Sequence, residues 1–357
     1  MQTETAELGF IYDAKKQRHI INDEMMKHFH YLSIHYEVKI VLFTIENLAL
    51  EEQMIHGTMI DKDGVRQEYT ELPSHVYNFA LHSTLSKIEK MRNLRKMENV
   101  IVINPINRFI QSIVFEMLSS LPGSHQFLLP SAQLTDDILI DYLNHSETLF
   151  LLPDKMFQQP KAVEIKKTNH YTYKISVGQN TQICHQDDLL SYVKKMINAK
   201  KHILMKGIEL FNTHEGPLEA RVNLQKNREG EWSVSAISAK CGIFSRDLFF
   251  ESNLPSSVNK FFLHKKKDSE SILVNTSLQI IRFLDFYIPF LGSCTLDYIF
   301  DEECRPYLVY VGGFEQSHSL YLQLDTRSQY KLIEQAFYYL LFLKRGGVHE
   351  MDQSSEK

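Results

Sequence analysis

The start of the chain alternates short apolar runs with an amphipathic segment. The run "LGFIYD" at residues 8–13 predicts a strand, and "INDEMMKHFHYL" at 21–32 predicts a helix. Asn22 or Asp23 is expected to begin that helix, because both side chains can cap a helix N-terminus. Residues 38–45, "VKIVLFTI", are apolar and rich in β-branched side chains, which favours a buried strand.

The next segments repeat the alternation of strand and helix. Asp63-Gly64 stands between two alternating runs and predicts a β-hairpin. Residues 75–81 predict a strand, 83–98 a helix capped by Ser83 or Thr84, and 99–104 a strand that runs into Pro105. Strands and helices in turn are typical of an open α/β sheet, which we expect for this part of the chain.

From about residue 148 the pattern changes to strands that follow one another closely. Strands are predicted at residues 148–154, 161–168, 171–178, 294–301 and 306–313, and around a Glu229-Gly230 turn within 218–242. In the last of these segments the alternation places Val222 and Leu224 on one face of the strand. Helices are predicted at 187–199, 269–290 and 327–344, so this part of the chain is expected to contain antiparallel sheets with helices packed on them.

Composition and charge bound the possible functions. The chain has 357 residues, of which 43% are hydrophobic and 23% charged, which indicates two or three globular domains. Its net charge of -5 gives no general attraction to nucleic acid or to an anionic membrane. The dense basic run Lys265-Lys266-Lys267 lies between "FFL" and "DSES", and we interpret it as a solvated loop rather than a phosphate-binding patch. No nucleic-acid partner is expected.

Cysteine spacing and hydropathy bear on the compartment. The four cysteines lack Cys-x-x-Cys spacing, which argues against a disulfide framework and a zinc knuckle and favours a reducing environment. The N-terminus "MQTETAELGF" has no basic leader followed by an apolar stretch. The apolar run Ala336–Leu343 is shorter than the roughly 20 residues that span a bilayer. We therefore expect an intracellular protein without a membrane span.

Several phrases, in this order of elements, resemble a known family. In the front part they are "LPSHVYNFA", "VIVINPINRF" and "FLLPSA"; further on comes "MKGIELFNTHEGPLEARVNLQKNREGEWSVSAISAKCG". Within the last phrase the family-like positions are Glu219, Arg221, Gln225, Lys226, Gly230 and Trp232. "LGSCTLDYIFDEECRPYLVYVGG" resembles a closing metal-site hairpin. Together they resemble the YheC/YheD family of endospore coat-associated proteins, in the ATP-grasp superfamily, over most of the chain.

The resemblance implies a fold and a division of the chain. We expect an ATP-grasp fold, in which an N-terminal open α/β domain is followed by two antiparallel α+β subdomains. The expected boundaries are 1–125 for the first domain, 126–210 for the small subdomain, 211–345 for the large subdomain with its closing hairpin, and 346–357 for a flexible tail.

The phosphate-binding positions implied by the family depart from its pattern. Leu152 stands where the family has a lysine, and no glycine occurs between Pro153 and Val177 to form a loop whose N–H groups approach phosphates. Lys155 or Lys161 could supply the positive charge instead. At the adenine end Met205 replaces a glutamine, while Lys206 and Glu209 could still meet the ribose or the adenine edge.

The implied magnesium site retains one ligand. Magnesium needs hard oxygen ligands in near-octahedral order. Asp297 is the surviving carboxylate, whereas Tyr310 replaces a second one with a phenol that is neutral at pH 7, and Gly312 replaces an asparagine. Ser293 replaces an acidic residue that is common in the family.

Arg221 admits two interpretations. In active relatives an arginine here can stabilise charge on a transferring phosphoryl or acyl-phosphate group, so Arg221 is the candidate catalytic residue. Alternatively it forms an ion pair with Glu219 or Asp297 across the sheet. Trp232, the single tryptophan, is expected in the core beneath its strand pair.

Two functional hypotheses follow from the resemblance. The first is a degenerate ATP-grasp protein with little or no ligase activity, located in the spore coat and acting there as a structural or binding partner of coat proteins. The second is an active ATP-dependent carboxylate-amine ligase that forms an acyl phosphate, with Lys155 or Lys161, Arg221 and Asp297 in altered roles. ATP and magnesium are the cofactors that the family implies, and the substitutions predict that they do not bind appreciably.

Overall fold

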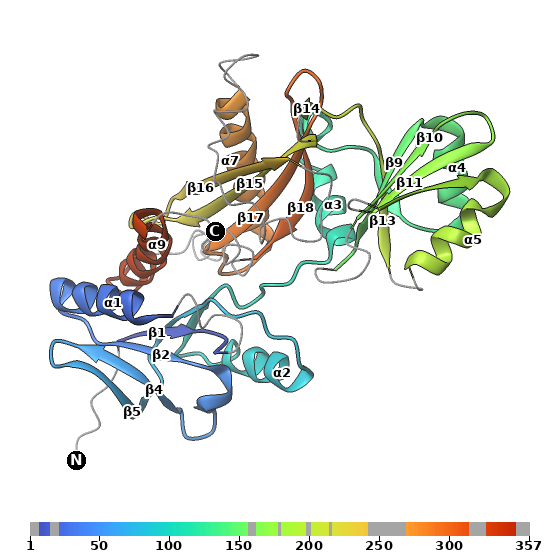
Figure 1. Cartoon of the computed structure of the whole chain (residues 1–357). Coiled ribbons are helices and arrows are strands. Elements are labelled where there is room, and N and C mark those ends of the chain that lie inside the picture. The colour runs from blue at the N-terminus through green and yellow to red at the C-terminus, as the bar shows by residue number, and fades with distance from the viewer. Residues whose placement is uncertain are drawn as a thin grey trace.

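Three β-sheets form the framework of the chain (Figure 1). The structure is a computed structural model, and it describes residues 7–14, 21–155, 162–177, 180–197, 201–213, 216–241, 269–313 and 326–347. Lys161, the basic run at 265–267 and most of the expected tail lie outside these residues. Within the described residues no helix is long and apolar enough to cross a membrane.

The N-terminal sheet has seven strands. They are β1 (Leu8–Ile11), β2 (Ile40–Phe43), β3 (Leu48–Ala49), β4 (Met54–Asp61), β5 (Gly64–Glu71), β6 (His75–Asn78) and β7 (Ile101–Ile103). Their order is β3-β4-β2-β1-β6-β7, with β5 paired to β4. β1 runs parallel to β2 and β6, and β6 parallel to β7, which confirms the predicted α/β arrangement. The predicted hairpin is formed by β4 and β5, although Gly64 pairs with Asp61, so that its two turn residues are Lys62 and Asp63.

Two helices accompany this sheet, α1 (Asp23–Tyr36) and α2 (Leu85–Leu94). Asn22 caps α1 by accepting a hydrogen bond from the Met25 backbone N–H at 2.9 Å, which confirms one of the two predicted caps. Met25, Phe29 and Leu32 recur at helical spacing and are buried against the sheet. Thr84, the residue before α2, makes no capping hydrogen bond with its side chain.

The second sheet has six strands in the order β12-β11-β10-β9-β13-β8. They are β8 (Ser131–Gln133), β9 (Thr148–Pro153), β10 (Val163–Lys167), β11 (Thr172–Val177), β12 (Asn180–His185) and β13 (His202–Lys206), accompanied by α4 (Asp136–His145) and α5 (Gln186–Ile197). β8, β12 and α4 are not among the predicted elements. β12 is an exposed edge strand whose one buried side chain is Cys184, so it lacks the apolar alternation by which strands are recognised.

The third sheet has five strands and carries the candidate site. It comprises β14 (Asn212–Thr213), β15 (Gly216–Lys226), β16 (Trp232–Cys241), β17 (Ser293–Phe300) and β18 (Pro306–Gly312). The helices around it are α3 (Gln111–Ser119), α7 (Ser269–Tyr287) and α9 (Thr326–Lys344). α9 lies between α1 and the β15–β16 hairpin, and so joins the first and third sheets (Figure 1).

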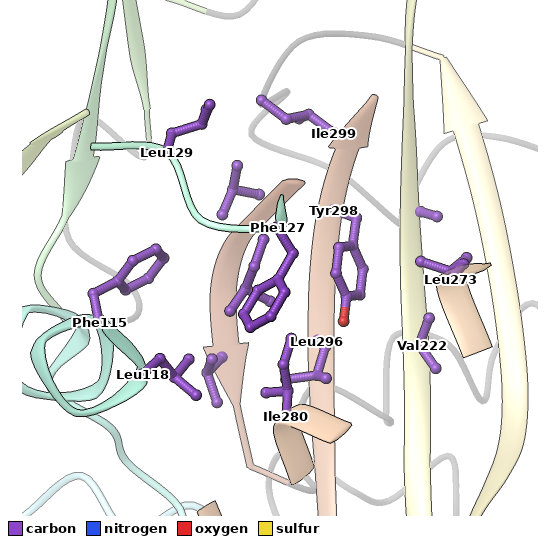
Figure 2. Close-up of a cluster of buried hydrophobic side chains, with 14 of the residues drawn as sticks. Phe115, Leu118, Phe127, Leu129, Val222, Leu273, Ile280, Leu296, Tyr298 and Ile299 are labelled. Atoms are coloured by element: carbon purple, nitrogen blue, oxygen red, sulfur yellow. The ribbon is translucent and has the colours of Figure 1, made fainter. Parts of the chain in front are cut away.

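One face of the third sheet is apolar. Val222 of β15 and Leu296 and Tyr298 of β17 pack against Leu273 and Ile280 of α7 in the largest apolar cluster (Figure 2). These side chains occupy alternate positions of their strands, as predicted for Val222 and Leu224. The intervening side chains of β15 therefore point to the opposite face of the sheet.

A buried ion pair fastens α7 to the hairpin of β15 and β16. Lys226 Nζ lies 2.8 Å from Asp285 Oδ2, and the two side chains are 1% and 2% exposed. The Trp232 indole N–H donates to the same carboxylate oxygen at 2.9 Å, and the Lys226 ammonium lies over the Trp232 and Tyr339 rings. Trp232 is thus a core residue, as predicted, and it also orients a buried charge.

Replacing Lys226 by methionine should destabilise the protein strongly. The substitution leaves the Asp285 carboxylate buried without its counter-charge, which costs about 3–5 kcal/mol of the free energy of unfolding. Urea unfolding followed by the fluorescence of Trp232 measures the change. Lys194→Met is the matched control, because the Lys194–Asp136 pair is about half exposed and should contribute under about 1 kcal/mol. Equal losses for the two variants would contradict this role of Lys226.

Candidate functional site

Polar side chains cover the face of the third sheet that α7 does not cover. Glu219, Arg221, Asn223 and Gln225 follow one another at alternate positions of β15, and all four are buried. β17 pairs with β15 so that Asp297 lies opposite Arg221 and Thr295 opposite Asn223. The strand order thus brings Glu219, Arg221 and Asp297 together on one face.

Arg221 and Asp297 form a two-fold hydrogen-bonded ion pair. Arg221 Nε donates to Asp297 Oδ1 at 2.6 Å, and Arg221 Nη2 donates to Oδ2 at 2.6 Å. The side chains are 6% and 16% exposed. Parallel bonds of this kind are among the strong charge-assisted hydrogen bonds of proteins. The predicted alternative of an ion pair across the sheet is therefore confirmed, and Asp297 is the partner.

The two other implied metal positions lie beside Asp297. Tyr310 of β18 is directly opposite Asp297, and Gly312 is opposite Thr295. These residues share the polar face, since residues opposite one another in a ladder point to the same side. Neither offers a carboxylate or an amide side chain. Among the described residues no group of three or more histidine, cysteine, aspartate or glutamate side chains could hold a metal ion.

Ser293 belongs to a joint between the first and third sheets. Asn104, just after β7, donates from Nδ2 to Ser293 Oγ at 2.7 Å, and its Oδ1 accepts from the backbone N–H groups of Gly292 and Ser293. Asn104 has a φ of 54°, which asparagine tolerates better than most residues. A Cβ atom at Gly292 would lie 2.3 Å from the Ile103 side chain, so the close approach of the two segments requires glycine.

Tyr77 of β6 is buried beside this joint. Its burial raises the pKa of the phenol to about 12.

The implied nucleotide end lies on the second sheet. Leu152 is 3% exposed and Met205 is fully buried, and both belong to the apolar cluster that contains Phe115 and Phe127. A side chain in this environment supplies no charge to a phosphate. Position 152 is therefore part of the hydrophobic core.

The remaining polar candidates of the second sheet are solvent-accessible. Lys155 follows β9 and Lys206 ends β13, and both are exposed. Glu209 pairs with Lys166 of β10 at 3.2 Å. On the same strand, burial raises the pKa of Glu164 above its usual value. Roles of Lys155, Lys206 and Glu209 in binding a nucleotide stay predictions.

Several structural partners could not be found from the sequence. Lys166 carries no signal that separates it from other polar residues near strand ends. Asn104 stands in the family-like phrase "VIVINPINRF", but the phrase does not indicate its contacts with Gly292 and Ser293. A signal did exist for the polar face, because Glu219, Arg221, Asn223 and Gln225 alternate strictly with apolar residues.

The family of the chain follows from comparison with known proteins. The model of the YheC/D like ATP-grasp family matches residues 99–343, which is more than half of the 357 residues. The chain belongs to the YheC/D-like ATP-grasp family. The resemblance inferred from the sequence phrases is thereby confirmed, and so is the ATP-grasp fold.

Individual relatives are distant. The endospore coat-associated protein YheD of Bacillus subtilis (strain 168) is 22% identical over 213 residues, which are 56% of this chain and 46% of that protein. The chain thus matches less than half the length of this curated relative.

Solved structures share the fold. The D-alanine-D-alanine ligase of Coxiella burnetii is similar with a TM-score of 0.53 at 8% identity, over 99% of each chain. The VanG D-Ala:D-Ser ligase of Enterococcus faecalis is similar with a TM-score of 0.51 at 8% identity, over 94% of this chain and 100% of that one.

A double-mutant cycle should reveal the Arg221–Asp297 pair. Arg221→Met leaves a largely buried carboxylate without its counter-charge and should lower the free energy of unfolding by about 3 kcal/mol or more. Arg221→Met combined with Asp297→Leu removes both charges and should cost clearly less than Arg221→Met alone. Calorimetric or urea unfolding of the wild type, Arg221→Met, Asp297→Leu and the double variant measures the coupling energy between the two side chains. Additive losses would contradict a direct interaction between the two side chains.

Proposed function

We propose that this member of the YheC/D-like ATP-grasp family acts as a structural or binding component with little or no ligase activity. The observation that supports the proposal most directly is the Arg221–Asp297 pair, in which both carboxylate oxygens already accept hydrogen bonds from the guanidinium. Activation of a carboxylate by ATP requires magnesium to bridge and neutralise the phosphate oxygens. The surviving ligand of the family is therefore held by a cation within the chain.

The residues on the polar face do not fit a magnesium ion. The ion needs several hard oxygen ligands in near-octahedral order. The site would offer Asp297, already paired with Arg221, a neutral phenol at Tyr310 and no side chain at Gly312. A cation approaching Asp297 would also meet the positive charge of Arg221. We therefore derive no catalytic step that passes through magnesium.

The phosphate side supports the same proposal. Leu152 lies in the apolar cluster in place of the cationic side chain that the family resemblance implies. The chain from Pro153 to Val177 contains no glycine, whose small size lets backbone N–H groups approach phosphates closely. The phosphate-binding positions lie on the second sheet and the magnesium positions on the third, so one compensating residue would not restore binding at both.

The proposed setting is the spore coat. The relative YheD is named as an endospore coat-associated protein, and we propose a similar association with coat proteins for this chain. The exposed candidates Lys155 and Lys206 are free to serve other contacts in this function. The alternative, an active carboxylate-amine ligase, would require Asp297 to bind a magnesium ion while the positive charge of Arg221 lies beside it.

Thermal unfolding with millimolar ATP, with and without magnesium, tests the proposal. A ligand that binds the native state at about 100 times its Kd stabilises it by about 2.7 kcal/mol, which would raise the Tm by several degrees. We expect no rise, in the wild-type protein and in Asp297→Asn alike. A magnesium-dependent rise that Asp297→Asn abolishes would overturn the proposal and favour the ligase.

A further inference from the structure

Among the strands that the structure describes, β5 is the outermost one at one margin of the N-terminal sheet. It pairs with β4 along all eight residues, whereas β2 and β3 pair with β4 from the other side (Figure 1). Val65 and Tyr69 of β5 are 48% and 68% exposed. Edge strands are templates for pairing with another chain, and charged side chains, lysine above all, proline or a bulge protect them. β5 contains no lysine or proline, its register with β4 is unbroken, and its charged residues Arg66 and Glu68 have opposite signs.

The hairpin geometry determines which backbone groups of β5 point outward. Asp61 and Gly64 close a two-residue turn, so they form a hydrogen-bonded pair. Hydrogen-bonded and non-hydrogen-bonded pairs alternate along an antiparallel ladder. The backbone groups of Gly64 and of every second residue after it therefore bond to β4. Those of Val65, Gln67 and Tyr69 point away from the sheet.

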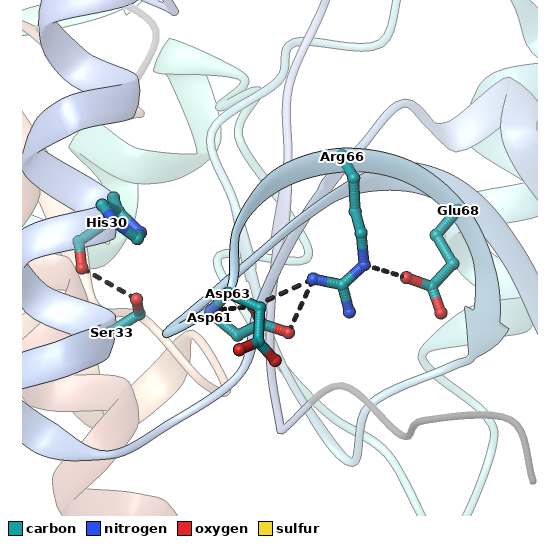
Figure 3. A network of polar contacts seen from close by, with 6 residues as sticks. All are labelled: His30, Ser33, Asp61, Asp63, Arg66 and Glu68. Atoms are coloured by element: carbon teal, nitrogen blue, oxygen red, sulfur yellow. Dashed lines mark hydrogen bonds and ion pairs between the residues drawn. The ribbon is translucent and has the colours of Figure 1, made fainter.

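The side chains of β5 alternate in the same way. Arg66 and Glu68 share one face, where Arg66 Nε donates to Glu68 Oε2 at 2.7 Å and Arg66 Nη1 lies 2.9 Å from Asp61 (Figure 3). Val65, Gln67 and Tyr69 share the opposite face. The strand thus offers outward backbone groups between one charged and one partly apolar row of side chains.

We propose that β5 pairs antiparallel with β5 of a second copy of this chain, about a two-fold axis at Gln67. This register bonds the outward groups of Gln67 to those of Gln67, and the groups of Val65 to those of Tyr69. Arg66 of each copy then lies opposite Glu68 of the other, and Val65 lies opposite Tyr69. Opposite charges and aromatic with β-branched side chains are favourable cross-strand pairs. A two-fold interface requires such self-complementarity.

The charges of Arg66 and Glu68 favour the register with the axis at Gln67 over registers that are shifted along the strand. An axis at Arg66 would place the two Arg66 side chains opposite each other, and an axis at Glu68 would place the two Glu68 side chains opposite each other. Like charges directly opposite one another destabilise a ladder. At the ends of the proposed ladder, Asp63 would face Glu71, which confines pairing to about five residues. An interface this small predicts a reversible monomer–dimer equilibrium.

This inference is independent of the proposed function, because β5 lies in the first sheet and the Arg221–Asp297 pair in the third. Sedimentation analysis of the full chain over a range of concentrations tests it. We expect wild-type dimers, and at least about a tenfold weaker association, equivalent to about 1.4 kcal/mol, for Arg66→Glu and for Glu68→Arg. An equal mixture of the two variants should dimerise again, since each variant then faces opposite charges.

Gln67→Pro provides a test that leaves the charges in place. Proline removes an N–H that points outward, so the β4 ladder stays intact while pairing with a second copy is blocked. Ile183→Pro is the matched control, since Ile183 is an exposed residue at the corresponding outward position of the edge strand β12. We expect a monomer for Gln67→Pro and a wild-type dimer for Ile183→Pro, with circular dichroism confirming that both are folded.

Three results would overturn the proposal. They are a wild-type chain that stays monomeric at submillimolar concentration, a folded Gln67→Pro variant that dimerises like the wild type, and a mixture of the folded charge variants that stays monomeric.

Discussion

The buried ion pair of Arg221 and Asp297 determines the charge and the hydrogen bonding at the centre of the polar face of the third sheet. A guanidinium and a carboxylate that are 6% and 16% exposed stabilise the folded state only while each satisfies the other. Their four-atom contact ties β15 to β17 at the centre of the polar face. A metal ion bound at Asp297 would lie beside the positive charge of Arg221, which disfavours its binding.

The rest of the architecture keeps this face in place. Behind it, Val222, Leu296 and Tyr298 pack on α7, and Lys226 binds Asp285 of the same helix. At the start of β17, Asn104 bonds to the backbone of Gly292 and Ser293 and holds the N-terminal sheet against the third sheet. These contacts hold the hairpin of β17 and β18 in place, at which the family resemblance implies a metal site.

Much of the fold could be predicted from the sequence, because the period of apolar residues in a segment predicts whether it forms a helix or a strand. The alternation in β15 and the Asp63-Gly64 turn each predict a structure that is present. β12 was missed because its exposed side chains lack apolar alternation. α3 and α4 were also missed, although α4 has apolar residues at helical spacing and a Thr135 cap that could have indicated it. The packing of α3 between β18, β8 and α7 depends on contacts distant in sequence. Domain boundaries at 125 and 210 stay predictions.

For the candidate site, the sequence indicated which residues to consider, but it did not indicate which side chains pair with one another. The family resemblance implies that Asp297, Tyr310 and Gly312 are positions of a metal-site hairpin, and the sequence left Glu219 and Asp297 open as partners of Arg221. The strand register places Asp297 directly opposite Arg221 across β15 and β17, where the two side chains form an ion pair. The partnership of Lys166 with Glu209 and the contacts of Asn104 likewise arise from tertiary structure.

The central claim, that Arg221 occupies Asp297 so that no divalent ion binds there, is tested most directly by electron paramagnetic resonance of Mn²⁺ and ATP titrated with the protein. Manganese prefers the same oxygen ligands as magnesium, and its spectrum changes when a protein binds it. The account predicts that adding the wild-type protein leaves the spectrum of Mn²⁺ with ATP unchanged. A protein-bound signal that disappears in Asp297→Asn would contradict it.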